Sequence, residues 1–330
     1  MPEQTLRFEF RKLGRTGARV SPLCLGAMNF GGRTSERDAV EIIHRFLDHG
    51  LNFIDTANVY SRGVSETFVG NALHDRRDRA FLATKVHGRM GDGPNEQGNS
   101  RVHIMAQVEK SLARLRTDWI DLYWIHRPDL GTPIDETLRA LDDLVRQGKV
   151  RYIGCSTFPA WQTMEALAVS DQLRLERFVA EQPPYNLLDR SLEEEVVPLC
   201  QKYGLGIMPW GPLAEGWLTD TYRSGQPAST GPRIESKKPD FTQPYIQERL
   251  KAIEGLAQIA GRKGCTLSQL ALAWLLAQPG VTSPIIGPRT MAHLEDNLGA
   301  LDVELSADDL RAIDAVVPPK ARLGGRRHWE

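Results

Sequence analysis

Four residues that could do acid–base chemistry follow apolar runs in the first half of the chain. Asp55 ends the apolar run Phe53–Ile54, and Tyr60 comes five residues later among small and polar residues; Lys85 ends a second run and His126 a third. A phenol beside an ammonium is suited to donate a proton to a carbonyl oxygen. A carboxylate can hold the ammonium charged, and an imidazole can hydrogen-bond the same oxygen. These residue types together indicate carbonyl chemistry.

The ammonium is expected to tune the phenol. A charge about 4 Å away at an effective dielectric constant near 20 contributes about 4 kcal/mol, which is roughly three pKa units. We therefore expect Lys85 to lower the pKa of Tyr60 towards neutral, with Asp55 offsetting part of the effect. Taken singly, each residue also has an ordinary structural interpretation, as an ion pair, a rim aromatic or a core histidine. Their joint occurrence at three strand ends favours a site.

The elements that must position these side chains are short apolar runs separated by amphipathic segments. The segment 35–50 predicts a helix capped by Ser35 and ended by Gly50. The segment 132–148 predicts another, with Thr132 as the cap and Pro133 in the first turn. Eight runs rich in Val, Ile and Phe predict strands at 23–28, 52–57, 80–86, 120–126, 152–157, 178–183, 204–210 and 283–288.

This alternation predicts parallel βα units that close into a (β/α)8 TIM barrel, as one domain over residues 1–330. A β-hairpin is expected before the first strand, and long loops after strands three and seven. A doubly wound open sheet is the competing architecture, but no strand is followed by GxGxxG. Consecutive barrel strands are neighbours, so the four side chains should converge at the C-terminal mouth.

The composition narrows the partners. A net charge of -1 gives no argument for nucleic acid or an anionic membrane as a partner. The four cysteines are widely separated and lack metal-ligand spacing, which predicts reduced thiols, no metal site and a cytoplasmic protein. No secretion signal is visible, and the most apolar stretch is shorter than the roughly 18 residues that a membrane span needs. Homo-oligomer formation is left open.

Landmarks along essentially the whole chain resemble those of the aldo-keto reductases. They are RKLGRTGARVSPLCLGAMNFG, NFIDTANVYSRGVSE, LATKV, DWIDLYWIHRPD, GKVRYIGCST, EQPPYNLLDR, PWGPLAEGWL and PIIGPRTMAHLEDN. The resemblance implies a (β/α)8 barrel that reduces aldehydes and ketones with a nicotinamide dinucleotide, usually NADPH. It also implies a small carbonyl substrate and a catalytic tetrad of Asp55, Tyr60, Lys85 and His126.

The resemblance further implies a set of cofactor residues. Ser156 and Gln182 would bind the nicotinamide carboxamide, and Trp210 would stack on the ring. Arg289 could pair with a 2′-phosphate, which favours NADP over NAD. Two positions depart from the commoner pattern, Thr157 from Asn and Gly211 from Ser. The full implied set is Gly26, Met28, Asp55, Ser156, Gln182, Trp210, Gly211, Pro212, Leu213, Gly216, Gly287, Arg289, Asp296 and Asn297.

Two other functions remain open at this stage. A barrel lysine such as Lys85 could form a Schiff base, although Asp55 would oppose the depressed pKa that this chemistry needs. The chain could also be a cofactor-binding regulatory subunit, as the potassium-channel beta subunits of this fold are. The substrate is not readable from one sequence; candidate pocket residues are Asn29, Phe30, His87, Arg127 and Trp329.

Overall fold

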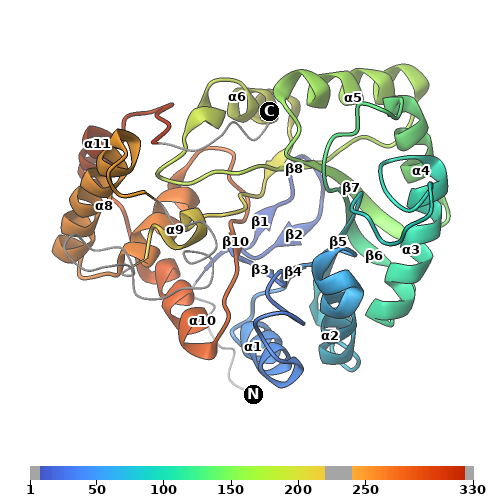
Figure 1. Cartoon of the computed structure of the whole chain (residues 1–330), viewed down its shortest axis with the longest axis horizontal. Helices are drawn as coiled ribbons and strands as arrows, with labels where there is room; N and C mark the ends of the chain where they lie inside the picture. Colours follow the sequence, from blue (N-terminus) through green and yellow to red (C-terminus); the bar gives the residue numbers. More distant parts are fainter. Residues whose placement is uncertain (1–7, 220–239, 324–330) are drawn as a thin grey trace.

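A computed structural model describes residues 8–219 and 240–323, and within them the eight expected strands form one parallel sheet. The strand order is β10-β3-β4-β5-β6-β7-β8-β9. The Ile285 amide donates to the Pro209 carbonyl at 2.8 Å. This bond joins the two ends of the sheet into a (β/α)8 TIM barrel (Figure 1). The strands are β3 (Cys24–Gly26), β4 (Phe53–Asp55), β5 (Phe81–Val86), β6 (Ile120–Ile125), β7 (Val150–Ser156), β8 (Ala180–Gln182), β9 (Gly206–Ile207) and β10 (Ile285–Ile286).

The barrel strands are buried on both faces, so alternate residues enter two different cores. Inward residues such as Phe53, Ala83 and Trp124 form the smaller cluster in the barrel interior. Outward residues pack against the helices in the larger cluster. Gly154 makes room for the indole of Trp124, because a Cβ at that position would lie 2.4 Å from a ring carbon.

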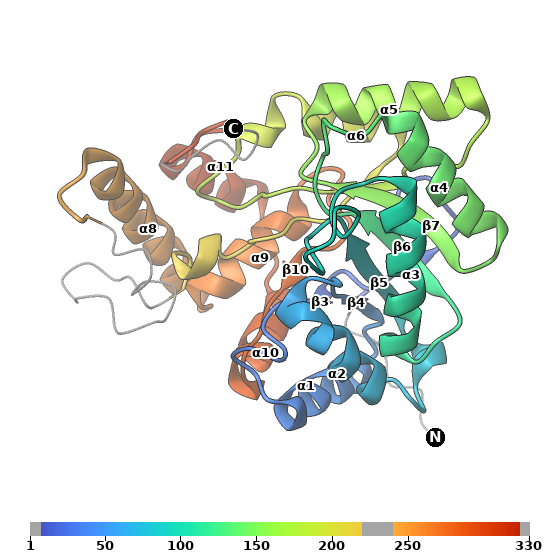
Figure 2. The same ribbon diagram turned by 45° about the vertical axis from the view of Figure 1, so that its right-hand side comes forward.

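Helices surround the barrel, and two further helices, α8 and α11, pack together outside the ring (Figures 1 and 2). Helix α9 is buried nearly all round because it lies between the barrel and α8. The helices are α1 (Glu36–Asp48), α2 (Val64–Ala72), α3 (Arg101–Leu115), α4 (Ile134–Arg146), α5 (Ala160–Leu173), α6 (Val196–Tyr203), α8 (Pro244–Lys263), α9 (Leu267–Ala277), α10 (Met291–Leu298) and α11 (Ala307–Val316).

Helix starts agree with the sequence in one case and differ in another. Ser35 caps α1 by accepting from the Asp38 amide, as predicted. The predicted start of α4 is wrong: Pro133 takes the cap position and the helix begins at Ile134. The Thr132 hydroxyl donates instead to Asp129 at 2.8 Å, so a nearer carboxylate competes successfully for it.

The predicted N-terminal hairpin is present and closes the lower end of the barrel. Strand β1 (Arg11–Lys12) pairs antiparallel with β2 (Arg19–Val20). Leu13 and Val20 are fully buried in the interior cluster. The Arg15 amide donates to the Gly204 carbonyl at 2.9 Å, which fixes the hairpin beneath the start of β9.

The two long loops lie at the opposite end, after the carboxyl ends of β5 and β9. The first runs from residue 87 to 100, between β5 and α3. The second runs from residue 208 to 243, between β9 and α8, and residues 220–239 of it lie outside the described part. Within residues 8–219 and 240–323, none of the helices has the length and apolarity that crossing a membrane requires.

Candidate active site

The ends of β4, β5 and β6 bring three of the four predicted side chains to one place. Asp55 ends β4 and pairs in register with Ala83 of β5, so Lys85 lies on the same inward face, two residues nearer the mouth. His126 follows β6, and its amide donates to the Val86 carbonyl at 2.9 Å, which extends the ladder by one bond. The register of the sheet therefore assembles these residues.

Lys85 is the centre of the arrangement. Its ammonium donates to the Asp55 carboxylate, to the Thr56 carbonyl at 2.8 Å and to the Tyr60 hydroxyl at 3.3 Å. The side chain is fully buried. An ammonium has three N–H donors, and all three are used, so Lys85 is held in one position with the phenol against it.

The loop that carries Tyr60 has an unusual backbone. Residues 61–63 all have positive φ values, between 48° and 94°. Such values cost a non-glycine residue roughly 1–2 kcal/mol, so other contacts must hold the loop. Ser61 Oγ donates to the Phe30 carbonyl at 3.1 Å, and Ser65 Oγ donates to another carbonyl of the same loop after β3 at 2.8 Å. The small polar residues after Asp55 thus fasten this turn.

A buried ion pair supports the same loop from behind. Glu66 of α2 is fully buried and accepts from Thr84 Oγ1 at 2.6 Å and from Arg114 Nε at 2.7 Å. The Arg114 side chain passes directly under Gly63, where a Cβ would lie 2.8 Å from it. The turn is therefore clamped to both β5 and α3.

His126 completes the group as a neutral imidazole. Its ring lies edge-on to that of Tyr60, with centroids 5.7 Å apart and an interplanar angle of 83°. Burial, followed by the charges of Lys85, Arg127 and His87, holds the pKa of His126 well below its ordinary value. A neutral ring can donate a hydrogen bond to an oxygen that also meets the Tyr60 hydroxyl.

The pKa shifts correct one prediction. Burial lowers the pKa of Lys85, but the Asp55 carboxylate and Tyr60 outweigh it, so the net shift is upward. Burial raises the pKa of Asp55 even though Lys85 opposes the shift. Burial also raises the pKa of Tyr60, and Lys85 lowers it by less. The prediction that Lys85 brings the pKa of Tyr60 below its ordinary value is therefore wrong, because desolvation of the phenolate is the larger effect.

Two of the expected carboxamide residues are joined to this group. Gln182, at the end of β8, donates through Nε2 to Asp55 Oδ1 at 3.1 Å. Ser156, at the end of β7, donates to the Gln182 carbonyl at 2.8 Å. The Gln182 Oε1 and the lone pairs of Ser156 Oγ remain as acceptors, which is what a carboxamide NH₂ group requires.

Trp210 is held by Thr157, which was noted above only as a departure from Asn. The indole Nε1 donates to Thr157 Oγ1 at 3.2 Å. Thr157 has a positive φ of 61°, which turns the chain after β7 towards the ring. The departure from Asn at this position thus puts a hydroxyl where it orients the expected stacking residue.

The expected pyrophosphate residues Gly211, Pro212, Leu213 and Gly216 form the turn after Trp210. Gly211 and Gly216 have φ values of 64° and 103°, and a Cβ at either would meet no heavy atom of the described residues within 4 Å. The backbone is therefore exposed on an open side, as close approach of a phosphate requires. Asn186 Nδ2 donates to the Gly211 carbonyl at 3.1 Å and steadies the turn.

Two other expected cofactor residues pack at the junction of β3 and β10. A Cβ at Gly26 would lie 2.6 Å from Ile285, and one at Gly287 would lie 2.9 Å from Met28 Sδ. Asn29 Nδ2 donates to the Gly287 carbonyl at 3.0 Å. The strands therefore pack too closely for a side chain at Gly26, whereas at Gly287 the end of the Met28 side chain occupies the space.

The remaining expected residues follow β10. Arg289 is partly buried, and its carbonyl accepts from Thr34 Oγ1 at 3.2 Å. Asp296 and Asn297 lie on α10, which Thr290 caps. Asp296 accepts from Thr266 Oγ1 at 2.9 Å, so one of its oxygens belongs to the cap of α9, and Asn297 is buried. The set as a whole fits an extended dinucleotide along β7 to β10 in residue type and position.

The candidate pocket residues have different positions. Phe30 is fully buried in the helix-side core, so its prediction as a pocket residue is wrong; the loop after β3 folds back and encloses it. Arg127 Cζ lies 5.6 Å from the centroid of the Trp210 ring, at the mouth. His87 Nδ1 hydrogen-bonds Asn99 Oδ1 at 3.0 Å. Trp329 lies outside the described residues.

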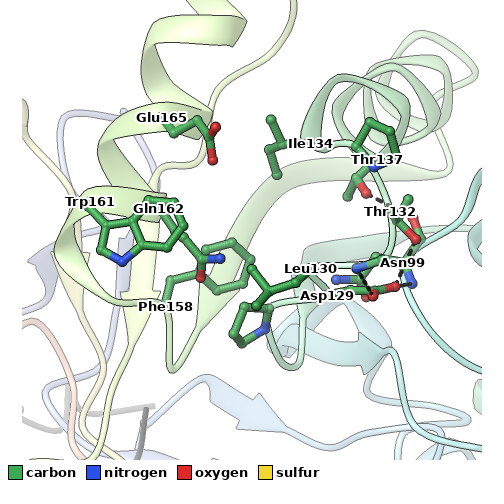
Figure 3. A pocket seen from close by; sticks show the side chains of 13 residues that line it. Asn99, Asp129, Leu130, Thr132, Ile134, Thr137, Phe158, Trp161, Gln162 and Glu165 are labelled. Atoms are coloured by element: carbon green, nitrogen blue, oxygen red, sulfur yellow. Dashed lines mark hydrogen bonds between the residues drawn. The ribbon is translucent and has the colours of Figure 1, made fainter. Parts of the chain in front are cut away.

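A separate cavity of about 330 Å³ lies between the start of α4 and the start of α5 (Figure 3). Leu130, Trp161 and Glu165 line it, and none of the four predicted catalytic residues does. Asn99 is also in its wall and donates to the Arg127 carbonyl at 2.9 Å. Among the residues that the structure describes, no group of three His, Cys, Asp or Glu side chains could hold a metal ion.

Comparison with known proteins agrees with this geometry. Residues 22–318 match the model of the aldo/keto reductase family. The chain is 40% identical over 321 residues to the uncharacterized oxidoreductase YrpG of Bacillus subtilis, covering 94% of this chain and 96% of that one. It is 38% identical to a probable voltage-gated potassium channel subunit beta of Oryza sativa subsp. japonica, covering 95% and 98% of the two chains. A protein of the same description from Arabidopsis thaliana is 37% identical, covering 89% and 92%.

Proposed function

The chain belongs to the aldo/keto reductase family, and from that premise we propose that it reduces aldehydes and ketones to alcohols with NADPH. The observation that carries the proposal is the buried contact of the Lys85 ammonium with both the Asp55 carboxylate and the Tyr60 hydroxyl. An acid held against a fixed cation at the barrel mouth is suited to protonate a carbonyl oxygen as that oxygen gains charge.

The residues divide the work as follows. Tyr60 donates its proton to the carbonyl oxygen, and Lys85 stabilises the phenolate that remains. His126, as a neutral imidazole, orients the same oxygen. NADPH bound along Trp210, the 211–216 turn and Arg289 would supply the hydride. Ser156 and Gln182 would fix the carboxamide, and the alcohol could be oxidised by the reverse path.

The Schiff-base alternative is disfavoured by electrostatics. A lysine that attacks a carbonyl must be neutral, whereas Asp55 and Tyr60 shift the pKa of Lys85 upward. Borohydride treatment with a carbonyl substrate and without nicotinamide tests this directly. A covalent adduct on Lys85 would support the Schiff-base enzyme over the reductase.

A second candidate function, a cofactor-binding regulatory subunit, is favoured by the similarity to the two plant proteins described as probable channel subunits. The experiment that separates the two is consumption of NADPH over a panel of aldehydes, ketones, methylglyoxal and sugars, repeated with NADH. The reductase gives multiple turnovers and a preference for NADPH. Tight binding of NADPH with no turnover on any carbonyl would instead favour the regulatory subunit.

The state of the thiols supports a proposal for the compartment. Cys24, Cys155, Cys200 and Cys265 are all unpaired. Free thiols, three of them buried and that of Cys265 partly exposed, are typical of a reducing environment, and we propose a cytoplasmic location on that basis. Immunoblotting of soluble and membrane cell fractions, prepared with protease inhibitors and probed with an antibody against the chain, would test the assignment.

A further inference from the structure

Arg127 lies at the mouth of the candidate site, and no carboxylate of residues 8–219 and 240–323 forms an ion pair with it. The Lys85 ammonium is paired with Asp55, and His126 is neutral near pH 7. Arg127, the residue after His126, is a guanidinium that keeps its proton under all ordinary conditions. Its side chain lies over the Trp210 ring, with Cζ 5.6 Å from the centroid.

The guanidinium lies beside both halves of the proposed reaction centre. It faces Trp210 on one side, where the nicotinamide ring is expected. It also acts electrostatically on Tyr60, whose pKa its charge helps to lower against the larger effect of burial. The reduced nicotinamide ring is uncharged, so binding of NADPH would leave the positive charge at this place unbalanced.

The backbone presents Arg127 rigidly. Asn99 is buried, and its Nδ2 donates to the Arg127 carbonyl at 2.9 Å. The Asn99 amide donates to Asp129 Oδ2 at 2.9 Å, and its Oδ1 contacts His87. These bonds tie the loop after β5 to the loop after β6. The Arg127 backbone is therefore held in place, and its exposed side chain reaches from a fixed point to the mouth, where a carboxylate can approach it.

We propose that Arg127 is the specificity-determining residue for this site, and that it selects carbonyl substrates that carry a carboxylate. The inference rests on the proposed function and goes beyond it by naming the substrate class. A planar guanidinium can receive a carboxylate through two parallel N–H bonds, which a neutral polar group of the same size does not match.

The test compares two aldehydes that differ in charge and hardly in shape, 4-formylbenzoate and 4-formylbenzamide. With NADPH, the wild-type protein gives a higher kcat/KM for the benzoate, mainly through KM. In Arg127→Gln, kcat/KM for the benzoate falls about tenfold to a hundredfold, while the value for the benzamide stays within about threefold. Arg127→Lys keeps the positive charge but not the planar guanidinium, so its kcat/KM for the benzoate lies between those of the wild type and Arg127→Gln. The matched control is Arg139→Gln, an exposed arginine on the outer helix α4, which leaves both values unchanged.

A binding measurement separates this inference from the proposed reaction. Titration calorimetry of the NADPH-loaded protein with 4-(hydroxymethyl)benzoate and with its amide requires no turnover, because a reduced cofactor and an alcohol cannot react with each other. Selective binding of the benzoate that Arg127→Gln abolishes supports the anion site even if neither aldehyde is reduced, in which case only the proposed function fails. Equal losses on both compounds would mean that Arg127 merely orients Trp210, and no loss on either would mean that the substrate does not reach it. Either result would overturn the inference.

Discussion

Gln182 Nε2 donates to Asp55 Oδ1 at 3.1 Å, so a residue expected to bind the cofactor also holds the carboxylate that orients Lys85. Ser156 donates in turn to the Gln182 carbonyl. The proposed cofactor contacts and the proposed proton donor therefore belong to one hydrogen-bonded group. A change at Gln182 should reach both.

Gln182→Leu is expected to weaken NADPH binding and to lower kcat together. The variant removes the carboxamide contact and also leaves Asp55 short of one buried donor, which costs roughly 1–3 kcal/mol. Thr157→Val is the comparison, because it removes the acceptor of the Trp210 indole and the 3.4 Å contact with Ser156 Oγ but leaves the donor to Asp55 in place. It should weaken binding about fivefold with kcat unchanged. Fluorescence titration measures the NADPH affinity of both variants, and steady-state kinetics measures their kcat. A Gln182→Leu protein with normal kcat would show that Gln182 does not support the proton donor through Asp55.

Tyr60→Phe should lower kcat by a factor on the order of 10² to 10⁴, the usual contribution of a general acid. Its ring keeps the edge contact with His126, so the fold and NADPH binding should be preserved. Turnover with a good aldehyde and a binding titration check this. Wild-type turnover in the variant would rule out Tyr60 as the proton donor.

The rate should respond to pH in opposite ways in the two directions. Reduction needs the protonated phenol, and burial places the pKa of Tyr60 above its ordinary value near 10. Reduction should therefore stay flat from about pH 6 to pH 9, without an inflection from His126, because burial holds the pKa of that imidazole well below its ordinary value. Alcohol oxidation needs the phenolate and should rise about tenfold per pH unit below that pKa. If the rate of reduction instead falls with a midpoint near pH 8, the effect of Lys85 on the pKa of Tyr60 is larger than that of burial in the enzyme–substrate complex.

Arg114→Met should destabilise the protein by about 3–5 kcal/mol, because it leaves the buried Glu66 carboxylate without its cation. Loss of the clamp under Gly63 should also lower kcat while NADPH binding persists. Arg101→Met on the same helix removes an exposed pair with Asp143 and should cost about 0–1 kcal/mol.

Denaturant unfolding and kinetics on these proteins test the clamp, together with the double variant Glu66→Gln/Arg114→Met. The double variant should recover part of the stability lost in Arg114→Met, since no uncompensated charge remains. If Arg114→Met unfolds like Arg101→Met, the ion pair does not hold the loop.

Glu181 should make stability depend on pH. It is fully buried, accepts from the Phe158 amide at 3.2 Å, and burial raises its pKa to about 8. Between its unfolded value and about pH 8 the folded protein holds a proton that the unfolded chain releases, so the free energy of unfolding falls as pH rises. The loss is on the order of 4 to 5 kcal/mol by pH 8 and is fully absent below the unfolded pKa.

Glu181→Gln should remove this dependence and keep the acceptor for Phe158. Unfolding curves at pH 5 and pH 8 for both proteins measure it, and Glu165→Gln on the exposed side of α5 serves as the control. Parallel pH curves for Glu181→Gln and the wild type would contradict the prediction.

Sequence reasoning succeeded where a local pattern determines a position. Apolar runs predicted all eight strands, and parallel strand order was enough to place Asp55, Lys85 and His126 at one mouth. It failed where a distant partner decides. Thr157 contacts Trp210, which is 53 residues away. The upward pKa shift of Tyr60 depends on desolvation, and a sequence shows the charged neighbours but not the depth of burial.

The hairpin of β1 and β2 closes the lower end of the barrel with Leu13 and Val20, so the candidate site is open only at the C-terminal mouth. Anything that reaches the Lys85 level must enter and leave by the same route. If the nicotinamide ring lies beneath the carbonyl compound, binding and release are ordered: the cofactor binds first and leaves last. The alcohol must depart before the spent dinucleotide can, and an excess of the carbonyl compound would then bind over that dinucleotide and trap it in a dead-end complex.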